Sequence, residues 1–158
     1  MITKFKIYEA KIIIKKLDYS LKKLSKLPEL PDTLEILYCN NNNLTELPNL
    51  SDSLIHLNCD NNQLVKLPEL PNSITRIYCS NNQLLKLTKI PDSLEVLYCY
   101  NNQLSEIPNL PFGLVYFRCH NNNLPYETIE EYWEWCKDNN KEHYENYIAY
   151  KNMEEFNI

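Results

Sequence analysis

Hydrophobic and polar positions recur along the chain with a period of 20 residues, and this register holds without insertion through five full cycles. Each cycle is centred on a cysteine: Cys39, Cys59, Cys79, Cys99 and Cys119. Apolar residues stand five and two positions before each cysteine: Leu34, Leu54, Ile74, Leu94 and Leu114, then Leu37, Leu57, Ile77, Leu97 and Phe117. Asparagine follows at three positions and leucine at five: Asn42, Asn62, Asn82, Asn102 and Asn122, then Leu44, Leu64, Leu84, Leu104 and Leu124.

The frame extends upstream in degenerate form. Ile14, Leu17, Leu24 and Leu27 occupy apolar slots, and Tyr19 stands in the cysteine slot. We therefore expect three parts: an N-terminal cap over residues 1–13, six repeats over 14–124, and a C-terminal cap over 125–158.

A 20-residue cycle limits the geometry of each repeat. The residues before each cysteine alternate in polarity, which predicts a short strand of about five residues. All strands point the same way, so the sheet is parallel, and the remaining ~15 residues are too few for a strand-to-strand return through a full helix. The prolines of the return favour extended, polyproline-like backbone. The sequence predicts a right-handed solenoid with strands about 4.8 Å apart.

The frame LxxLxCxxNxLxxLPxLPxS resembles the leucine-rich repeat in its shortest class, and the resemblance covers about 110 of 158 residues. The LPxLP return is similar to the repeats of bacterial type III effector proteins. The Tyr-Cys pair before the asparagines resembles repeat proteins encoded by giant viruses of amoebae, of mimivirus type. The resemblance implies a parallel sheet on a concave face, extended convex returns and a cap at each end.

The repeated polar residues are interpreted as structural. In-register Cβ atoms lie near the strand spacing, which exceeds the 3.5–4.5 Å that a disulfide prefers, and a straight row of sulfur atoms cannot surround one metal tetrahedrally. The cysteines are therefore expected to be buried and inert. Each asparagine amide is expected to bond backbone groups of its own bend and of the adjacent coil, as a ladder. No metal or cofactor is expected.

Composition narrows the function classes. Gly113 is the single glycine, so phosphate-cradling and dinucleotide-binding loops are excluded. The net charge is -5, with a basic start, +6 over residues 1–26, and an acidic tail, -6 over residues 124–158. The lysine-rich start is interpreted as a solvated end, and no nucleic-acid partner is expected. With no signal peptide or membrane segment visible, we expect an intracellular protein, in the host cytoplasm, with free thiols.

One motif points to catalysis. Effector proteins with this repeat type can carry a ubiquitin ligase domain whose nucleophile lies in a Cys-x-Asp motif, and Cys136-Lys137-Asp138 has those letters. The family's catalytic part is a large helical domain, whereas only 34 residues follow the last repeat here. The motif is therefore interpreted as part of a cap, and the protein as a non-enzyme, with ligase-like activity a remote alternative.

The two chain ends are expected to cap the solenoid. Thr128 to Glu131 has the form of a capping box, which predicts a helix from about 128 to 137. Its apolar face consists of Ile129, Tyr132, Trp133 and Cys136. A second helix, to about 155, is expected to supply Tyr144, Tyr147, Ile148 and Tyr150 as contacts of the cap. At the other end, ITKFKIY alternates like a strand and is expected to supply the N-terminal cap.

The concave face is the predicted functional surface. Alternate strand positions must point outward there, in three columns that vary from cycle to cycle. The columns are Ile36, His56, Arg76, Val96 and Tyr116; Tyr38, Asn58, Tyr78, Tyr98 and Arg118; and Asn40, Asp60, Ser80, Tyr100 and His120. Tyrosine and arginine are enriched in binding hot spots. The candidate partner-binding residues are Tyr38, Arg76, Tyr78, Tyr98, Tyr100, Tyr116, Arg118 and His120.

Two interpretations of this surface stay open. The tyrosines either bind a protein or peptide partner, as in a non-enzymatic interaction module with a host target, or pair across strands to support the sheet. A structural protein that stacks head to tail is the alternative function, because the basic start of one copy would meet the acidic tail of the next. The sequence does not identify the partner.

Overall fold

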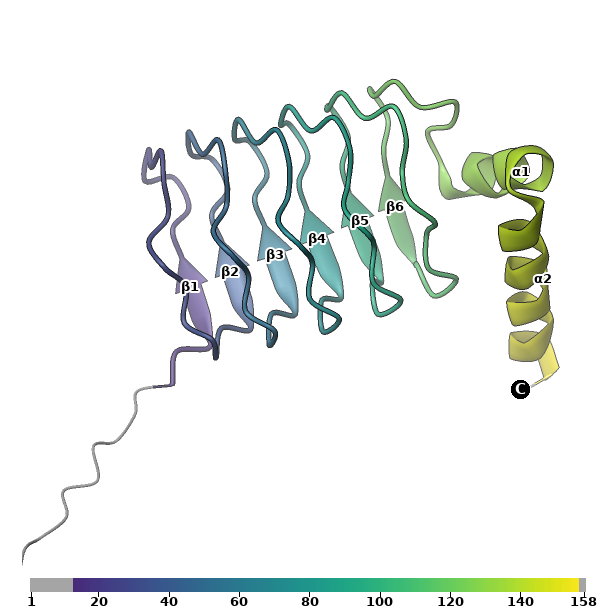
Figure 1. The fold of residues 1–158 in the computed structure, drawn as a ribbon, viewed down its shortest axis with the longest axis horizontal. Helices are drawn as coiled ribbons and strands as arrows, with labels where there is room; N and C mark the ends of the chain where they lie inside the picture. The colour runs from purple at the N-terminus through teal and green to yellow at the C-terminus, as the bar shows by residue number, and fades with distance from the viewer. Residues whose placement is uncertain (1–12, 157–158) are drawn as a thin grey trace, which may run out of the picture.

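The computed structural model describes residues 13–156, with side chains through residue 153. One parallel sheet runs the length of the molecule in the order β1-β2-β3-β4-β5-β6 (Figure 1). The strands are β1 Lys16–Asp18, β2 Ile36–Tyr38, β3 His56–Asn58, β4 Arg76–Tyr78, β5 Val96–Tyr98 and β6 Tyr116–Arg118. The predicted solenoid is confirmed, although each strand has three residues rather than about five.

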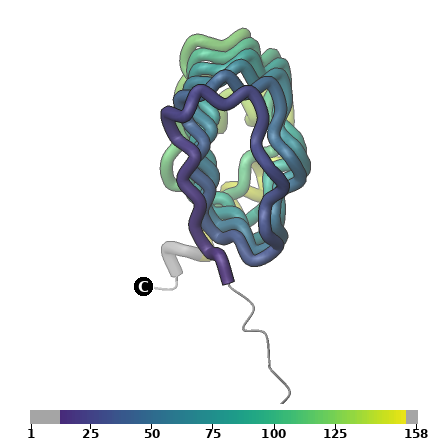
Figure 2. Tube along the Cα trace, turned by 90° about the vertical axis from the view of Figure 1, so that its left-hand side faces the viewer, coloured from purple at the N-terminus to yellow at the C-terminus, as the bar shows by residue number. Residues whose placement is uncertain are grey.

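Strand register follows the sequence period. Residues 20 apart are opposite each other in every pair, from Leu17↔Leu37 to Leu97↔Phe117. Viewed along the array, the coils overlie one another as a flattened ring (Figure 2). The register places every side chain of one column against its equivalent in the next coil, so similar packing contacts recur between successive coils.

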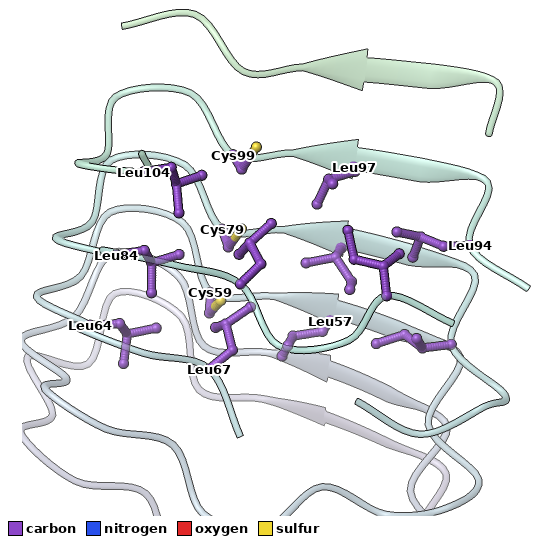
Figure 3. Close-up of a cluster of buried hydrophobic side chains, with 14 of the residues drawn as sticks. Leu57, Cys59, Leu64, Leu67, Cys79, Leu84, Leu94, Leu97, Cys99 and Leu104 are labelled. Carbon is purple, nitrogen blue, oxygen red and sulfur yellow. The ribbon is translucent and has the colours of Figure 1, made fainter. Parts of the chain in front are cut away.

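The core lies inside this ring. Leucine and cysteine columns fill it, with Cys59, Cys79 and Cys99 stacked in one row and Leu64, Leu84 and Leu104 in another (Figure 3). Each of these six side chains is fully buried. Full burial of a leucine side chain stabilises the fold by about 1.5–3 kcal/mol, so the columns supply most of the driving force for coil stacking.

The asparagine columns make the bend between strand and return. In the ladder, Asn62 Nδ2 donates to the carbonyls of Cys39 and Cys59, each at 3.0 Å, and Asn62 Oδ1 accepts from Leu44 N at 3.0 Å. The same bonds recur at the equivalent asparagines. One side chain thereby satisfies backbone groups of two coils that no regular sheet bond reaches.

A second asparagine position explains how the bends form without glycine. One residue before each ladder asparagine, the backbone has positive φ, between 54° and 57°, at Asn41, Asn61, Asn81, Asn101 and Asn121. Asparagine tolerates this left-handed conformation better than most other non-glycine residues. The bend is therefore set by two adjacent asparagines with different tasks, one conformational and one hydrogen-bonding.

Two helices cover the C-terminal end of the array: α1 Ile129–Asn139 and α2 Lys141–Phe156 (Figure 1). Thr128 caps α1, because its Oγ1 accepts from Glu131 N at 3.2 Å. The reciprocal half of the predicted capping box is different: the Glu131 carboxylate accepts from Glu127 N, at 2.8 Å, and not from the backbone of Thr128.

The cap packs through an aromatic cluster. Tyr132, Trp133 and Cys136 of α1 are buried, as predicted, and Tyr132 OH accepts from Leu110 N at 3.1 Å. Trp133 stacks on Tyr147 with ring centroids 3.9 Å apart. The contact predicted for Ile148 is wrong, since this side chain is exposed and His143 is buried in the cluster instead. The predicted strand ITKFKIY lies outside the described residues.

Candidate functional site

The outward side of the sheet, called here the strand face, carries a continuous aromatic row. The row consists of Tyr38, His56, Tyr78 and Tyr98, one from each of β2 to β5. Neighbouring ring centroids are 5.1, 5.3 and 5.2 Å apart along the row. His56 stands in another column than the tyrosines, since it pairs in register with Ile36 and Arg76. The rings of adjacent coils nevertheless meet edge to face or stacked, which stabilises the sheet.

A cation closes each end of the row. Lys16 Nζ of β1 lies 5.0 Å from the Tyr38 ring centroid, and Arg118 Cζ of β6 lies 5.1 Å from that of Tyr98. Both distances suit cation–π attraction. The row thus spans all six strands, with its rings half-buried against one another.

His56 has a special place within this row. Its Nε2 atom is buried and has no hydrogen-bond partner among the described residues. Burial, and then the charges of Arg76 and Lys16, lower the pKa of His56. The imidazole is therefore neutral at pH 7 and packs as a ring rather than as a cation.

The column after the cysteines is less exposed than predicted. Ser80 is fully buried, and its backbone N–H donates to the Asp60 carboxylate of the preceding coil. Tyr100 and His120 stack with ring centroids 4.7 Å apart and an angle of 5° between the rings. Burial raises the pKa of Asp60 to about 6. The outward position predicted for Ser80 is wrong, because this small side chain is covered where its larger neighbours project.

Val96 is a second correction in the predicted outward columns. Its side chain is buried on the strand face. At the equivalent position of the next coil, Tyr116 remains 59% exposed. The longer side chains around Val96 cover it. A partner at this position would therefore contact those neighbours and not Val96.

A groove of about 550 Å³ lies where the strand face meets the cap. Tyr98, Tyr116, Arg118 and His120 line one side, together with Val115 and Phe117, and Glu127, Thr128, Ile129 and Glu130 line the other. Half of the eight candidate residues therefore gather at one end of the molecule. Tyr38, Arg76, Tyr78 and Tyr100 do not line this groove.

The residues on the cap side of the groove were missed from the sequence. They lie outside the repeat, so no periodic column marks them. The capping box at Thr128 located the start of α1 correctly, but it did not show that this start faces β6.

The cysteines carry no sign of a reactive centre. All six are free and buried. Burial raises the pKa of Cys39 and of Cys119 to about 12, and it also raises the pKa of Cys136. A thiol with a raised pKa is protonated at neutral pH and is a poor nucleophile.

No cluster of three or more histidine, cysteine, aspartate or glutamate side chains is arranged to hold a metal ion within residues 13–156. In the same part of the chain, neither helix is long and apolar enough to cross a bilayer.

Comparisons with known proteins agree with the fold. Residues 93–114 match the Leucine Rich Repeat family. No curated protein matches the chain. The repeat domain of a Shigella effector, a solved structure, is 32% identical with a TM-score of 0.70, over 73% of this chain and 53% of that one.

Two structures of YopM are also similar. YopM from Yersinia enterocolitica is 36% identical with a TM-score of 0.65, over 66% of this chain and 23% of that one. YopM from Yersinia pestis, a leucine-rich effector protein, is 44% identical with a TM-score of 0.62, over 65% of this chain and 31% of that one. The chain spans between about a quarter and a half of the length of these structures. With its repeat frame, sheet register and helical cap, the chain is a leucine-rich-repeat solenoid similar to the repeat domains of bacterial effectors.

Proposed function

We propose that the protein is a non-enzymatic interaction module that binds a protein or peptide through the strand face, and that its partner is a host protein. The observation that carries this proposal is the groove between β6 and the cap, where Tyr116 and Arg118 stand exposed beside Tyr98 and His120. Leucine-rich repeats generally bind proteins, and the similar structures are effectors, which supports the proposal. An origin in a giant virus and a location in the host cytoplasm belong to the same proposal.

The tyrosines of the strand face suit two different roles, support of the sheet and binding of a partner. Tyr38, Tyr78 and Tyr98 pack against other rings and are half-buried, so part of their role is support of the sheet. Tyr116 makes none of the ring contacts found among the described residues and is 59% exposed. An exposed tyrosine without ring contacts keeps most of its surface available to a partner, so Tyr116 is the best anchor candidate.

Cys136 is a poor candidate for ligase-like catalysis. Its side chain is fully buried in the cap, and burial raises the pKa of the thiol. A catalytic cysteine needs access to substrate and a stabilised thiolate. The contacts of Cys136 support a packing role instead.

The test is a double variant, Tyr116→Ala with Arg118→Ala, measured against a partner isolated from host lysate and then purified. We expect affinity, measured by calorimetry, to fall at least tenfold, because hot-spot truncations cost about 2 kcal/mol or more. The matched control is Val65→Ala with Leu85→Ala, which removes exposed apolar side chains away from the strand face. Unchanged affinity in the first variant, with both variants folded, would contradict the proposal.

A further inference from the structure

The helical cap covers only half of the last coil. Its bend half is sealed, since Cys119 and Leu110 are buried beneath Tyr126 and Tyr132. Its strand half is open, because Leu114 and Phe117 are partly exposed, whereas the equivalent side chains of the four coils before it are buried to 1% exposure or less: Leu34, Leu37, Leu54, Leu57, Ile74, Ile77, Leu94 and Leu97. The core therefore ends in an apolar strip that the cap covers only in part.

The backbone of this strip is also unpaired. In the sheet of described residues, β6 pairs with β5 alone. Glu95 O accepts from Val115 N at 2.9 Å and from Tyr116 N at 3.0 Å, but Val115 O has no such donor within residues 13–156. Cys99 N donates to Arg118 O at 2.9 Å, while Cys119 N lacks a backbone acceptor in that range. An edge of this kind is a template for another strand.

Two grooves make the edge accessible. The 550 Å³ groove lies on the strand-face side, and a second, of about 240 Å³, lies between the last coil and the helices. The second groove is lined by Phe112, Leu114, Ile129, Glu130, Trp133, Tyr147 and Lys151. Ile129 and Glu130 line both grooves, so the two openings adjoin at the start of α1.

We infer that β6 binds an extended segment of a partner protein, which adds to the sheet as a seventh strand parallel to β6. The inference deepens the proposed function by naming the form of its partner, and it rests on that function for its biological meaning. Strand addition obtains its affinity from main-chain hydrogen bonds and its specificity from alternate side chains. Here the sheet already repeats the same interface five times, so the chemistry of the missing strand is known from the coils themselves.

The repeat also fixes the direction and spacing of the segment. Inward side chains in a coil are spaced three and then two residues apart, as at Leu94, Leu97 and Cys99. This spacing is asymmetric, so apolar side chains oppose Leu114, Phe117 and Cys119 in register only when the segment runs parallel. The partner segment is therefore extended, with apolar residues at i, i+3 and i+5.

The probe is a synthetic peptide with residues 93–101 of this chain, carrying Cys99→Ala to prevent oxidation. It is added to the full ¹⁵N-labelled chain with a nitroxide at either peptide end. We expect saturable shifts of the amides of residues 114–120. The label at the peptide's N-terminus is expected to broaden residues 113–115, and the label at its C-terminus residues 119–121.

Two control peptides isolate the interactions. Leu94→Asp with Leu97→Asp removes the apolar side chains, and N-methylation of the residues matching Glu95 and Val96 removes the donors to Val115 O. Each is expected to weaken binding at least tenfold. Absence of shifts at millimolar peptide, an antiparallel label pattern, or binding at β1 would overturn the inference.

The outcomes separate this inference from the proposed function. Amide hydrogen exchange of residues 115–122 is measured with the purified host partner. If Tyr116→Ala with Arg118→Ala abolishes partner binding but the partner leaves exchange at these amides unchanged, the proposed function stands and strand addition is wrong. If the peptide binds in parallel and no partner responds to the double variant, strand addition stands and the proposed function is wrong.

Discussion

The asparagine bend and the strand face belong to the same coils and follow opposite rules. In the bend, one residue type returns every 20 positions and makes the same backbone bonds each time. On the strand face, a single position of the same register carries isoleucine, histidine, arginine, valine and tyrosine in successive coils: Ile36, His56, Arg76, Val96 and Tyr116. The bend must satisfy buried backbone groups, which are identical in every coil, whereas the strand face need only be compatible with its neighbours. A residue type that repeats in every coil therefore indicates a requirement of the fold. A position whose residue type varies from coil to coil can be selected for function.

The sharpest way to break the bend is Asn62→Ala. The substitution leaves Leu44 N buried and unpaired, because Asn62 Oδ1 is its acceptor. It also removes one of the two donors to each of Cys39 O and Cys59 O, which keep their bonds from Asn42 and Asn82. We expect a loss of about 3–5 kcal/mol in the free energy of unfolding, since the unsatisfied amide costs about 1–3 kcal/mol and each of the two lost bonds to the carbonyls about 0.5–1.5 kcal/mol. Urea unfolding followed by circular dichroism measures it.

Gln63→Ala is the matched control, because its side chain is exposed on the same bend. We expect a change below about 0.5 kcal/mol, as is usual for surface substitutions. Equal losses in the two variants would contradict a special role for the ladder.

The cysteine column gives the second-largest expected effect. Cys79→Ser places a hydroxyl among fully buried apolar side chains and is expected to cost about 2 kcal/mol. Cys79→Ala removes the sulfur without adding a polar group and is expected to cost less. If serine were tolerated better than alanine in chemical unfolding, the column would not be the apolar environment that the structure shows.

On the strand face, we expect smaller losses of stability, which differ between a packed tyrosine and an exposed one. Tyr78→Ala removes ring contacts with His56 and Tyr98, at 5.3 and 5.2 Å, and is expected to cost about 1–2 kcal/mol of stability. Tyr116→Ala is expected to cost less than about 0.5 kcal/mol, because this ring is exposed. Thermal unfolding of the two variants tests the split, and a larger loss for Tyr116 would reverse the assignment of support and binding roles.

Asp60 predicts the subtlest effect, a pH dependence. Burial raises its pKa from 3.8 to about 6 in the folded state, so the folded chain holds this proton more tightly than the unfolded chain does. The resulting stabilisation is complete below about pH 4 and is lost as the pH rises through 6. Asp60→Asn lacks this loss, so we expect its stability relative to the original chain to increase between pH 4 and pH 7. A constant difference across that range would contradict the assignment.

The periodic part of the molecule could be predicted because its rules are local. The cysteine every 20 residues predicted the positions of β2 to β6. Leu17, in the degenerate first cycle, predicted the position of β1, and it lies in register with Leu37 of β2. The asparagine columns indicated the bend because buried backbone needs partners. Strand length was overestimated, since the residue two positions before each of β2 to β6 bonds within a turn of its own coil, as Leu54 N does to Ser51 O.

The burial of individual side chains, the groove and the contacts of the cap could not be predicted from the 20-residue period. Burial of Ser80 and Val96 follows from the sizes of their neighbours in adjacent coils, which vary. The groove depends on how α1 approaches β6, and the cap is not part of the repeat. The exchange of His143 for Ile148 in the cap contacts follows from the position at which α2 begins, immediately after Asn140. The prediction and the structure differ where a side chain contacts a residue of another type than the equivalent residue of the next coil.

The constant register of 20 residues has a consequence for how such a molecule can change its length. Insertion of one whole coil between β3 and β4 would meet the same neighbours above and below, since both interfaces have the same register. Duplication of a 20-residue segment in the gene therefore leaves the existing coil contacts intact, whereas loss of a single residue shifts every later column out of alignment. The array can grow or shrink by whole coils while its terminal caps stay the same.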